Sequence, residues 1–229
     1  MTSLPVSLTH TEKCLGWSFW GLQMLALPSI IALLVPVFAP GLGAAEQNFL
    51  YLAFSFLVVS AIMLRFLRES LKIFLARPFY ALRWAGISYI LYWVSFLALS
   101  FLLTTLFPTF QNANDTTVFE IFNENRTLTT IGVVVLAPIT EELLYRGVIF
   151  GSIHSRSRFA AYALSCMVFS AVHVVGYIGQ WDMLTLALCF LQYIPAGLCL
   201  AWAYERSGTI WAPILIHIAV NQTGILSWR

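Results

Sequence analysis

Charged residues are scarce in this sequence, and their scarcity excludes most classes of protein. Only 10% of the 229 residues are Asp, Glu, Lys or Arg, whereas 60% are hydrophobic and the mean hydropathy is +0.83. A typical soluble domain carries about 25% charged residues. The chain lacks the side chains to cover a water-facing surface, which excludes a soluble enzyme, a nucleic-acid-binding protein and a disordered chain. A lipid bilayer is the environment that this composition fits.

Cysteine is also rare, and the patterns that hold a disulfide framework or a common metal site are missing. The four cysteines lie in or beside apolar runs, and no CxxC pair occurs. An HExxH motif, which would begin a zinc site on one helix, is absent as well. We therefore expect the cysteines to be small apolar side chains without a redox role. The net charge of +2 is too small to indicate a charged partner.

Long apolar runs are what the sequence has in place of charge. A helix needs about 20 apolar residues to cross a hydrocarbon core about 30 Å thick, and its backbone must satisfy its own hydrogen bonds there. We therefore predict an all-α fold, a polytopic transmembrane helix bundle with about seven membrane-spanning helices. The predicted spans are Leu15–Phe38, Phe49–Leu67, Trp84–Phe107, Leu128–Phe150, Phe159–Tyr177, Leu184–Trp202 and Trp211–Trp228.

The basic residues between these spans are unevenly distributed. One face carries Lys13, Arg65, Arg68, Lys72, Arg77, Arg83, Arg156, Arg158 and Arg206, whereas the other carries Arg126 and Arg229. Lys and Arg in short loops resist translocation. We therefore predict an integral, multi-pass membrane protein with a cytoplasmic N-terminus. The polar loop Pro108–Thr127 is predicted to lie on the opposite face, and His154 is predicted to be solvated in a loop.

Several polar side chains lie inside the predicted spans, where each ionisable one costs about 2.5–3.5 kcal/mol to insert. They are Glu141, Glu142, Arg146, His173 and His217, followed one turn later by Asn221. Glu142 and Arg146 are four residues apart, so they share a helical face and can neutralise each other. Glu141 is turned about 100° around the same helix. It is therefore free to point toward another helix.

Two further pairs, Phe169 with His173 and His217 with Asn221, have the same spacing of four residues. A carboxylate and an imidazole can hold and deprotonate a water molecule, and an imidazole and an amide can donate hydrogen bonds to an oxyanion. Taken singly, each pair is more often a structural contact between or within packed helices than a catalytic one. The three pairs together favour a hydrolase.

The motifs EExxxR (Glu141, Glu142, Arg146), FxxxH (Phe169, His173) and HxxxN (His217, Asn221) resemble the CAAX-protease and bacteriocin-processing family of intramembrane proteases, also called CPBP or ABI. The similarity spans about Leu128–Trp228. It divides one integral membrane domain into N-terminal helices with an outer loop, residues 1–127, and a catalytic transmembrane core, residues 128–229.

This resemblance implies a glutamate-dependent endopeptidase. Glu141 and His173 would activate the attacking water, and His217 and Asn221 would stabilise the oxyanion. Glu142, Arg146 and Phe169 would be supporting residues.

The resemblance also implies a substrate and bears on a cofactor. The substrate would be a membrane-associated or lipidated peptide or protein, cleaved near the cytoplasmic half of the bilayer, with lipid as the other partner and no nucleic acid. No cofactor is expected. Because the family was long described as metalloproteases, zinc ligated by Glu141, His173 and His217 is the alternative.

Two other functions fit parts of the pattern. Glu141, His173 and His217 would also suit a proton relay in a transporter, although the inverted repeats common in transporters are not visible. A catalytically silent membrane scaffold is the third possibility. One geometric conflict is evident, because these three residues spread over about 12 Å of depth when counted from the predicted cytoplasmic helix ends. Tilted helices, or a fifth helix that begins before Phe159, would remove it.

Overall fold

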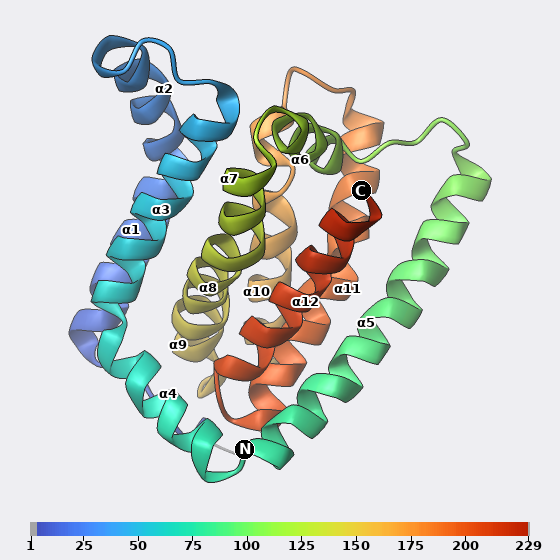
Figure 1. The fold of residues 1–229 in the computed structure, drawn as a ribbon. Coiled ribbons are helices and arrows are strands. Elements are labelled where there is room, and N and C mark those ends of the chain that lie inside the picture. The colour runs from blue at the N-terminus through green and yellow to red at the C-terminus, as the bar shows by residue number, and fades with distance from the viewer. Residues whose placement is uncertain (1–3, 229) are drawn as a thin grey trace.

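The computed structural model describes residues 4–228, and within that range the chain folds as a bundle of helices without a β-sheet (Figure 1). Five helices are long and apolar enough to cross a membrane, or six if one bent pair forms a single span. The all-α, multi-pass fold is therefore confirmed, and the predicted number of seven spans is approximate. The last helix, α12 (Trp211–Ser227), is apolar but has only 17 residues.

The first predicted span is broken into two helices. Helix α1 (His10–Leu25) and helix α2 (Leu27–Phe38) meet at Ala26 with a bend of 56°. Pro28 lies in the first turn of α2. Because proline lacks an N–H and its ring disfavours a helical conformation in the preceding residue, the chain turns there and starts a new helix.

The second predicted span is placed too late in the sequence. Helix α3 (Ala44–Ile62) begins before it, and helix α4 (Leu64–Ala76) is a separate amphipathic helix at the basic end of the bundle. The predicted span runs too far because apolar residues continue beyond Ile62, where Arg65, Arg68 and Lys72 interrupt them every three or four positions. Helix α5 (Pro78–Leu106) then crosses the bundle and starts before its predicted boundary.

The predicted outer loop is largely helical. Asn112 caps helix α6 (Ala113–Glu124) by accepting hydrogen bonds from the backbone N–H groups of Asn114 and Asp115. One face of α6 is buried through Ala113, Ile121 and Phe122. In Figure 1 this helix lies across the end of the bundle opposite the described N-terminus.

A single long helix, residues 126–154, forms the centre of the molecule. It consists of α7 (Arg126–Ile131), a π-helical segment (Gly132–Leu136), α8 (Ala137–Glu142), a second π-helical segment (Leu143–Phe150) and α9 (Gly151–His154). Pro138 has no backbone N–H to donate to the preceding turn. The π-helical segment directly before it accommodates this missing hydrogen bond without a break in the helix. Segments of this kind are frequent at functional sites.

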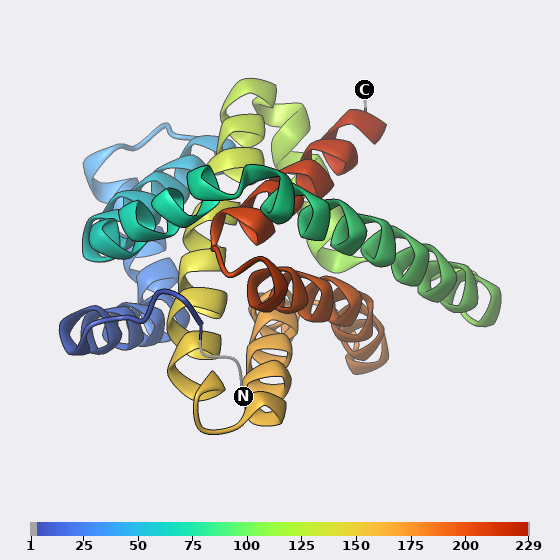
Figure 2. The ribbon, with the colours of Figure 1, turned by 90° about the horizontal axis from the view of Figure 1, so that it is seen from below.

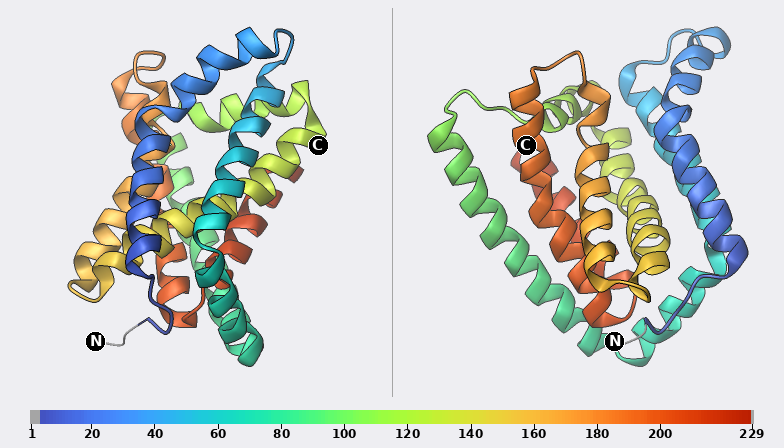
Figure 3. Two further views of the ribbon diagram at one scale, coloured as in Figure 1. Left: turned by 90° about the vertical axis from the view of Figure 1, so that its left-hand side faces the viewer. Right: turned by 180° about the vertical axis from the view of Figure 1, so that it is seen from behind.

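The central helix is the most buried of the membrane-span candidates, which makes it the core of the fold. Helices α10 (Arg158–Val172), α11 (Met183–Ser207) and α12 pack around it, with α1 and α3 flanking one side and α5 the other (Figure 3). Its lower half is fully buried, including Leu143, Val148 and Phe150. His154 at its end is also buried and bonds to Glu205 at 2.8 Å, so the prediction of a solvated His154 is wrong.

Candidate active site

Glu142 and Arg146 form an ion pair in the interior of the bundle, as their spacing predicts. Nη1 of Arg146 lies 2.9 Å from Oε1 of Glu142, and neither side chain is exposed. Nη2 of Arg146 donates a further hydrogen bond to the backbone oxygen of Gly197 at 3.1 Å. The pair therefore fixes the central helix against α11 as well as neutralising its own charges.

His217 extends this ion pair to a third helix, which the spacing of the motifs does not predict. Its Nδ1 lies 2.8 Å from Oε1 of Glu142. An ionised carboxylate can only accept a hydrogen bond, so Nδ1 carries the proton. This contact fixes the orientation of the ring and leaves Nε2 directed toward the other carboxylate of the motif.

Glu141 points away from Arg146 and lies between two imidazoles. Its Oε2 is 3.9 Å from Nε2 of His173 and 4.0 Å from Nε2 of His217, and it has no hydrogen-bond partner within the described chain. A water molecule about 2.8 Å from Oε2 and from either Nε2 would see the two atoms at an angle of about 90°, which is suitable for two hydrogen bonds. The position next to Glu141 can therefore hold a water molecule.

His173 lies at the C-terminal cap of α10, where a local contact fixes its proton. Its Nδ1 donates to the backbone oxygen of Phe169 at 2.7 Å, because a carbonyl oxygen can only accept. In the neutral ring, Nε2 is then the acceptor and faces Glu141. The ring of Phe169 packs between His173, at 4.7 Å between centroids, and the guanidinium of Arg146, at 4.5 Å.

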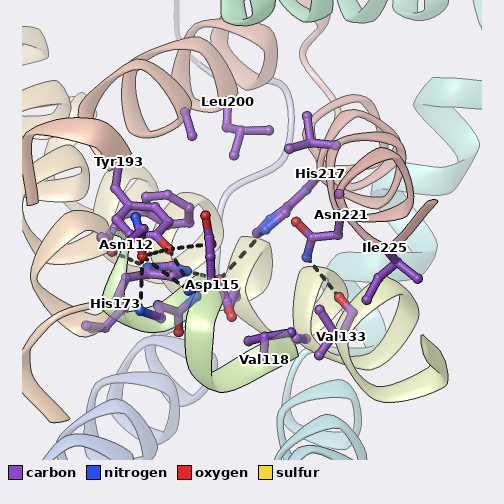
Figure 4. Close-up of a pocket in the computed structure, with 18 of the residues that line it drawn as sticks. Asn112, Asp115, Val118, Val133, His173, Tyr193, Leu200, His217, Asn221 and Ile225 are labelled. Carbon is purple, nitrogen blue, oxygen red and sulfur yellow. Dashed lines mark hydrogen bonds and ion pairs between the residues drawn. The ribbon is translucent and has the colours of Figure 1, made fainter. Parts of the chain in front are cut away.

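Asn221 lines the same cavity, but its amide makes a different contact. Nδ2 donates to the backbone oxygen of Val133 at 2.8 Å, within the first π-helical segment (Figure 4). An amide nitrogen carries two hydrogens, so one remains for another acceptor. The structure thus brings Glu141, His173 and His217 together and places Asn221 on the wall beside them.

The helix ends explain why Glu141 and His173 lie at the same depth. The central helix continues to His154 instead of ending at Phe150, which places Glu141 deeper, at the level of His173. Helix α10 starts at Arg158, only one residue before its predicted start. Glu141 lies near the middle of the central helix, and the cavity beside it extends toward α6. His173 ends α10 at the side of the bundle that carries α6.

A cavity of about 630 Å³ contains these side chains. Glu141, His173, His217 and Asn221 line it together with residues of α1, α3, α5 and α6. Figure 4 shows Asp115, Tyr193 and both histidines turned toward this space. The lining is mostly apolar and aromatic with a few polar groups, as is typical of ligand sites.

Two residues of the cavity were not identified from the sequence. Tyr193 of α11 stacks on His173 with 4.2 Å between ring centroids, and its hydroxyl accepts a hydrogen bond from Asn114 at 3.0 Å. That hydroxyl also lies 3.4 Å from Oδ1 of Asp115. The only signal in the sequence was the polar pair Gln192 and Tyr193 within an apolar run.

Asp115 has accessible surface, but that surface faces the cavity. Burial by the surrounding protein raises the pKa of its carboxyl group from 3.8 to about 6, against the opposing effect of the Tyr193 hydroxyl. Asp115 therefore changes its charge within the range of pH in which many proteins work.

Glu141, His173 and His217 are the candidate ligands for a zinc ion. Two ligands about 2.0–2.1 Å from a tetrahedral zinc ion lie about 3.3 Å apart. The separations of 3.9 and 4.0 Å from Glu141 to the two histidines are longer, and no group of three His, Cys, Asp or Glu side chains among residues 4–228 has the geometry of a metal site. The arrangement observed fits a water molecule better than a bound metal ion.

Relatives in three bacteria align with less than half of the chain. An Escherichia coli protein described as an uncharacterized 24.3 kDa protein is 32% identical over 43% of this chain and 43% of its own length. "Putative membrane peptidase YdiL" of Bacillus subtilis (strain 168) is 32% identical over 38% of this chain and 32% of its own length. UPF0177 protein YxdF of Lactococcus lactis subsp. lactis (strain IL1403) is 29% identical over 39% of this chain and 44% of its own length. The chain thus aligns with between 32% and 44% of the length of each relative.

The sequence profile of one family covers the helices that build the site. Residues 123–223 match the family described as type II CAAX prenyl endopeptidase Rce1-like, and no solved structure matches the chain. The matched segment contains all three polar motifs and runs from the start of the central helix into α12. Over this segment, the chain is similar to the Rce1-like proteins of the CAAX-protease and bacteriocin-processing family.

Proposed function

We propose that this protein is an intramembrane endopeptidase that hydrolyses a peptide bond with a water molecule activated by Glu141 and His173. The observation that carries the proposal is the position of Glu141, whose Oε2 has no partner and lies at 3.9 and 4.0 Å from two imidazole nitrogens. The substrate is a membrane-associated or lipidated peptide or protein. The family match and the membrane peptidase named among the relatives support this activity.

The first step forms a bond between the water oxygen and the peptide carbonyl carbon. Glu141 accepts one proton of the water, and Nε2 of His173 accepts a hydrogen bond from it, because Nδ1 of His173 already holds its own proton against Phe169. The carbonyl oxygen becomes an oxyanion. When the carbon–nitrogen bond breaks, Glu141 returns its proton to the leaving amine, so the reaction needs no other reactant.

The oxyanion would be bound from the opposite side by His217 and Asn221. Nδ1 of His217 is occupied by Glu142, so Nε2 can donate only when the ring is cationic. The amide hydrogen of Asn221 that does not bind Val133 is the second donor. Neither step requires a metal ion, and we propose a cofactor-free enzyme.

The test compares Glu141→Gln with the wild type in proteoliposomes that contain a library of membrane-anchored reporter peptides. We expect a folded protein whose cleavage rate falls by at least about 1,000-fold, since the base is lost while the shape is kept. Glu69→Gln is the matched control, because Glu69 is a partly exposed partner of Lys72 at the basic end and lies far from the cavity. Full cleavage by Glu141→Gln would overturn the proposal. Comparing the membrane peptides of cells carrying either form would identify natural substrates.

A further inference from the structure

The cavity that contains Glu141 extends toward one end of the bundle only. Its lining comes from the last turn of α1, the first half of α3, most of α12, and α6 with its N-cap, through Asn112, Asn114 and Asp115. In Figure 1, α6 lies over the central helices at the end opposite the described N-terminus. Among residues 4–228, none of the lining residues belongs to α4, to α9 or to the turn between α11 and α12.

The other end of the bundle is closed by close packing. Val148, Phe150 and Ile210 are fully buried between the Arg146 ion pair and this end. The turn between α11 and α12 is tied to α4 by Thr209, whose hydroxyl donates to the backbone oxygen of Ser70 at 2.9 Å. The N-terminal segment runs beneath the helices at this end (Figure 2), with Leu8 in the core. A peptide has no path to Glu141 from this side.

A network of charged side chains adds to the closure. Glu205 accepts hydrogen bonds from His154 at 2.8 Å, from Arg158 at 2.7 and 2.8 Å and from Tyr162 at 2.8 Å. These four residues join the ends of the central helix, α10 and α11. The contacts satisfy both oxygens of the carboxylate, so this end is held shut by polar contacts as well as apolar ones.

The closed end is also the basic end. It carries the nine Lys and Arg residues from Lys13 to Arg206, whereas the α6 end has Arg126, and Arg229 lies outside the described residues. Arg206 lies over the rings of Trp84 and Trp202 at 5.1 and 5.6 Å, an arrangement typical of side chains at a membrane interface. Since basic residues are retained on the cytoplasmic side, the open end of the cavity faces away from the cytoplasm.

We propose that the substrate reaches Glu141 from the extracytoplasmic side, through a mouth formed by α6. The inference rests on the proposed peptidase function and adds the class of substrate: an exported or membrane-anchored peptide whose scissile bond lies in the outer half of the bilayer. A tail held at the cytoplasmic surface would have to cross the bilayer to meet Glu141. The site is then suited to segments that have already been translocated.

The first experiment measures which face is open, without any need for activity. The four natural cysteines are replaced by alanine or serine, and single cysteines are introduced by Asp115→Cys at the mouth and Arg68→Cys on the exposed face of α4. A membrane-impermeant maleimide is added to intact spheroplasts or to inverted membrane vesicles. We expect the Asp115→Cys protein to be labelled at least about tenfold faster in spheroplasts than in inverted vesicles. The Arg68→Cys protein should be labelled in inverted vesicles only.

Other patterns of labelling overturn the proposal. Faster labelling of the Asp115→Cys protein in inverted vesicles would place the mouth at the cytoplasm. Labelling of this cysteine only after unfolding, with normal labelling of the Arg68→Cys protein, would show that α6 does not form an open mouth. The same measurements in a Glu141→Gln background remain valid if the protein has no peptidase activity, so the two proposals fail separately.

The second experiment asks whether the mouth carries substrate. A bulky impermeant maleimide is added to spheroplasts that contain the Asp115→Cys protein and a membrane-anchored reporter cleaved by the parent. We expect cleavage to fall at least about tenfold after labelling, and to be unchanged in the cysteine-free parent. Complete labelling with undiminished cleavage would overturn entry past α6, even if the orientation were correct. Absence of cleavage by the cysteine-free parent would contradict the proposed function instead.

Discussion

His217 and Glu142, on two different helices, share a hydrogen bond of 2.8 Å between Nδ1 and Oε1. The same Oε1 accepts the hydrogen bond from Arg146 at 2.9 Å. One buried carboxylate therefore holds a guanidinium that belongs to the core and an imidazole that faces the cavity. Glu141, its neighbour in the sequence, makes neither contact and remains available for chemistry.

We expect Glu142→Gln to destabilise the protein far more than Glu141→Gln. A glutamine at position 142 would leave the charge of Arg146 buried without a counter-ion, which typically costs about 3–5 kcal/mol. Glu141 is partly open to the cavity, so its amide variant should lose less than about 1 kcal/mol. The yield of folded protein and its thermal unfolding midpoint in detergent measure the difference. Equal midpoints, or activity lost only in Glu142→Gln, would reverse the roles of the two glutamates.

We expect the losses from His173→Ala and Asn221→Ala to be strongly non-additive. The two groups serve the same transition state, and removing one member of such a unit abolishes most of what the other contributes. Each single change should lower the rate of a single turnover by about 100- to 1,000-fold. The double variant should be less than about tenfold slower than the slower single variant. A fold reduction in the double variant equal to the product of the two single reductions would argue against a shared site.

We expect cleavage to be independent of bound metal. The separations of Glu141 from His173 and His217 fit a water molecule better than a zinc ion, and the carboxylate can serve as the base by itself. Elemental analysis of purified protein should find no stoichiometric transition metal, and phenanthroline should leave the rate of cleavage unchanged within about twofold. One zinc ion per chain, lost and regained together with activity, would make the same three residues ligands.

We expect Asp115→Asn to change how stability depends on pH. The pKa of Asp115 rises from 3.8 to about 6 on folding, so the folded protein binds this proton more tightly than the unfolded chain. The resulting stabilisation is fully present below about pH 4 and is lost as pH rises through about 6.

This dependence is measured as the difference between the unfolding midpoints of the wild type and Asp115→Asn in detergent. The two unfolding midpoints should be closest near pH 4. Between pH 4 and about pH 7, the midpoint of the variant should rise relative to that of the wild type. A difference that stays constant between pH 4 and 7 would show that Asp115 titrates normally.

Local patterns in the sequence determined the fold class and part of the site. Apolar runs with few charges predict transmembrane helices, because a bilayer admits little else. The spacing of four residues between Glu142 and Arg146 predicts their ion pair, because residues one turn apart share a helical face whatever surrounds them. The same rule turns Glu141 toward other helices. Each of these conclusions depends only on residues close together in the chain.

The tertiary structure decided the contacts between helices and the direction in which the site opens. Glu142 and His217 are 75 residues apart, and Tyr193 meets His173 only because α11 packs against α10. Helix α6 appeared as a polar loop in the sequence because its few apolar positions are buried only when it packs against the end of the bundle. The depth of Glu141 depended on where the central helix ends. Helical periodicity gives the face of each helix, but relative depth and neighbours are set by packing, which no single segment contains.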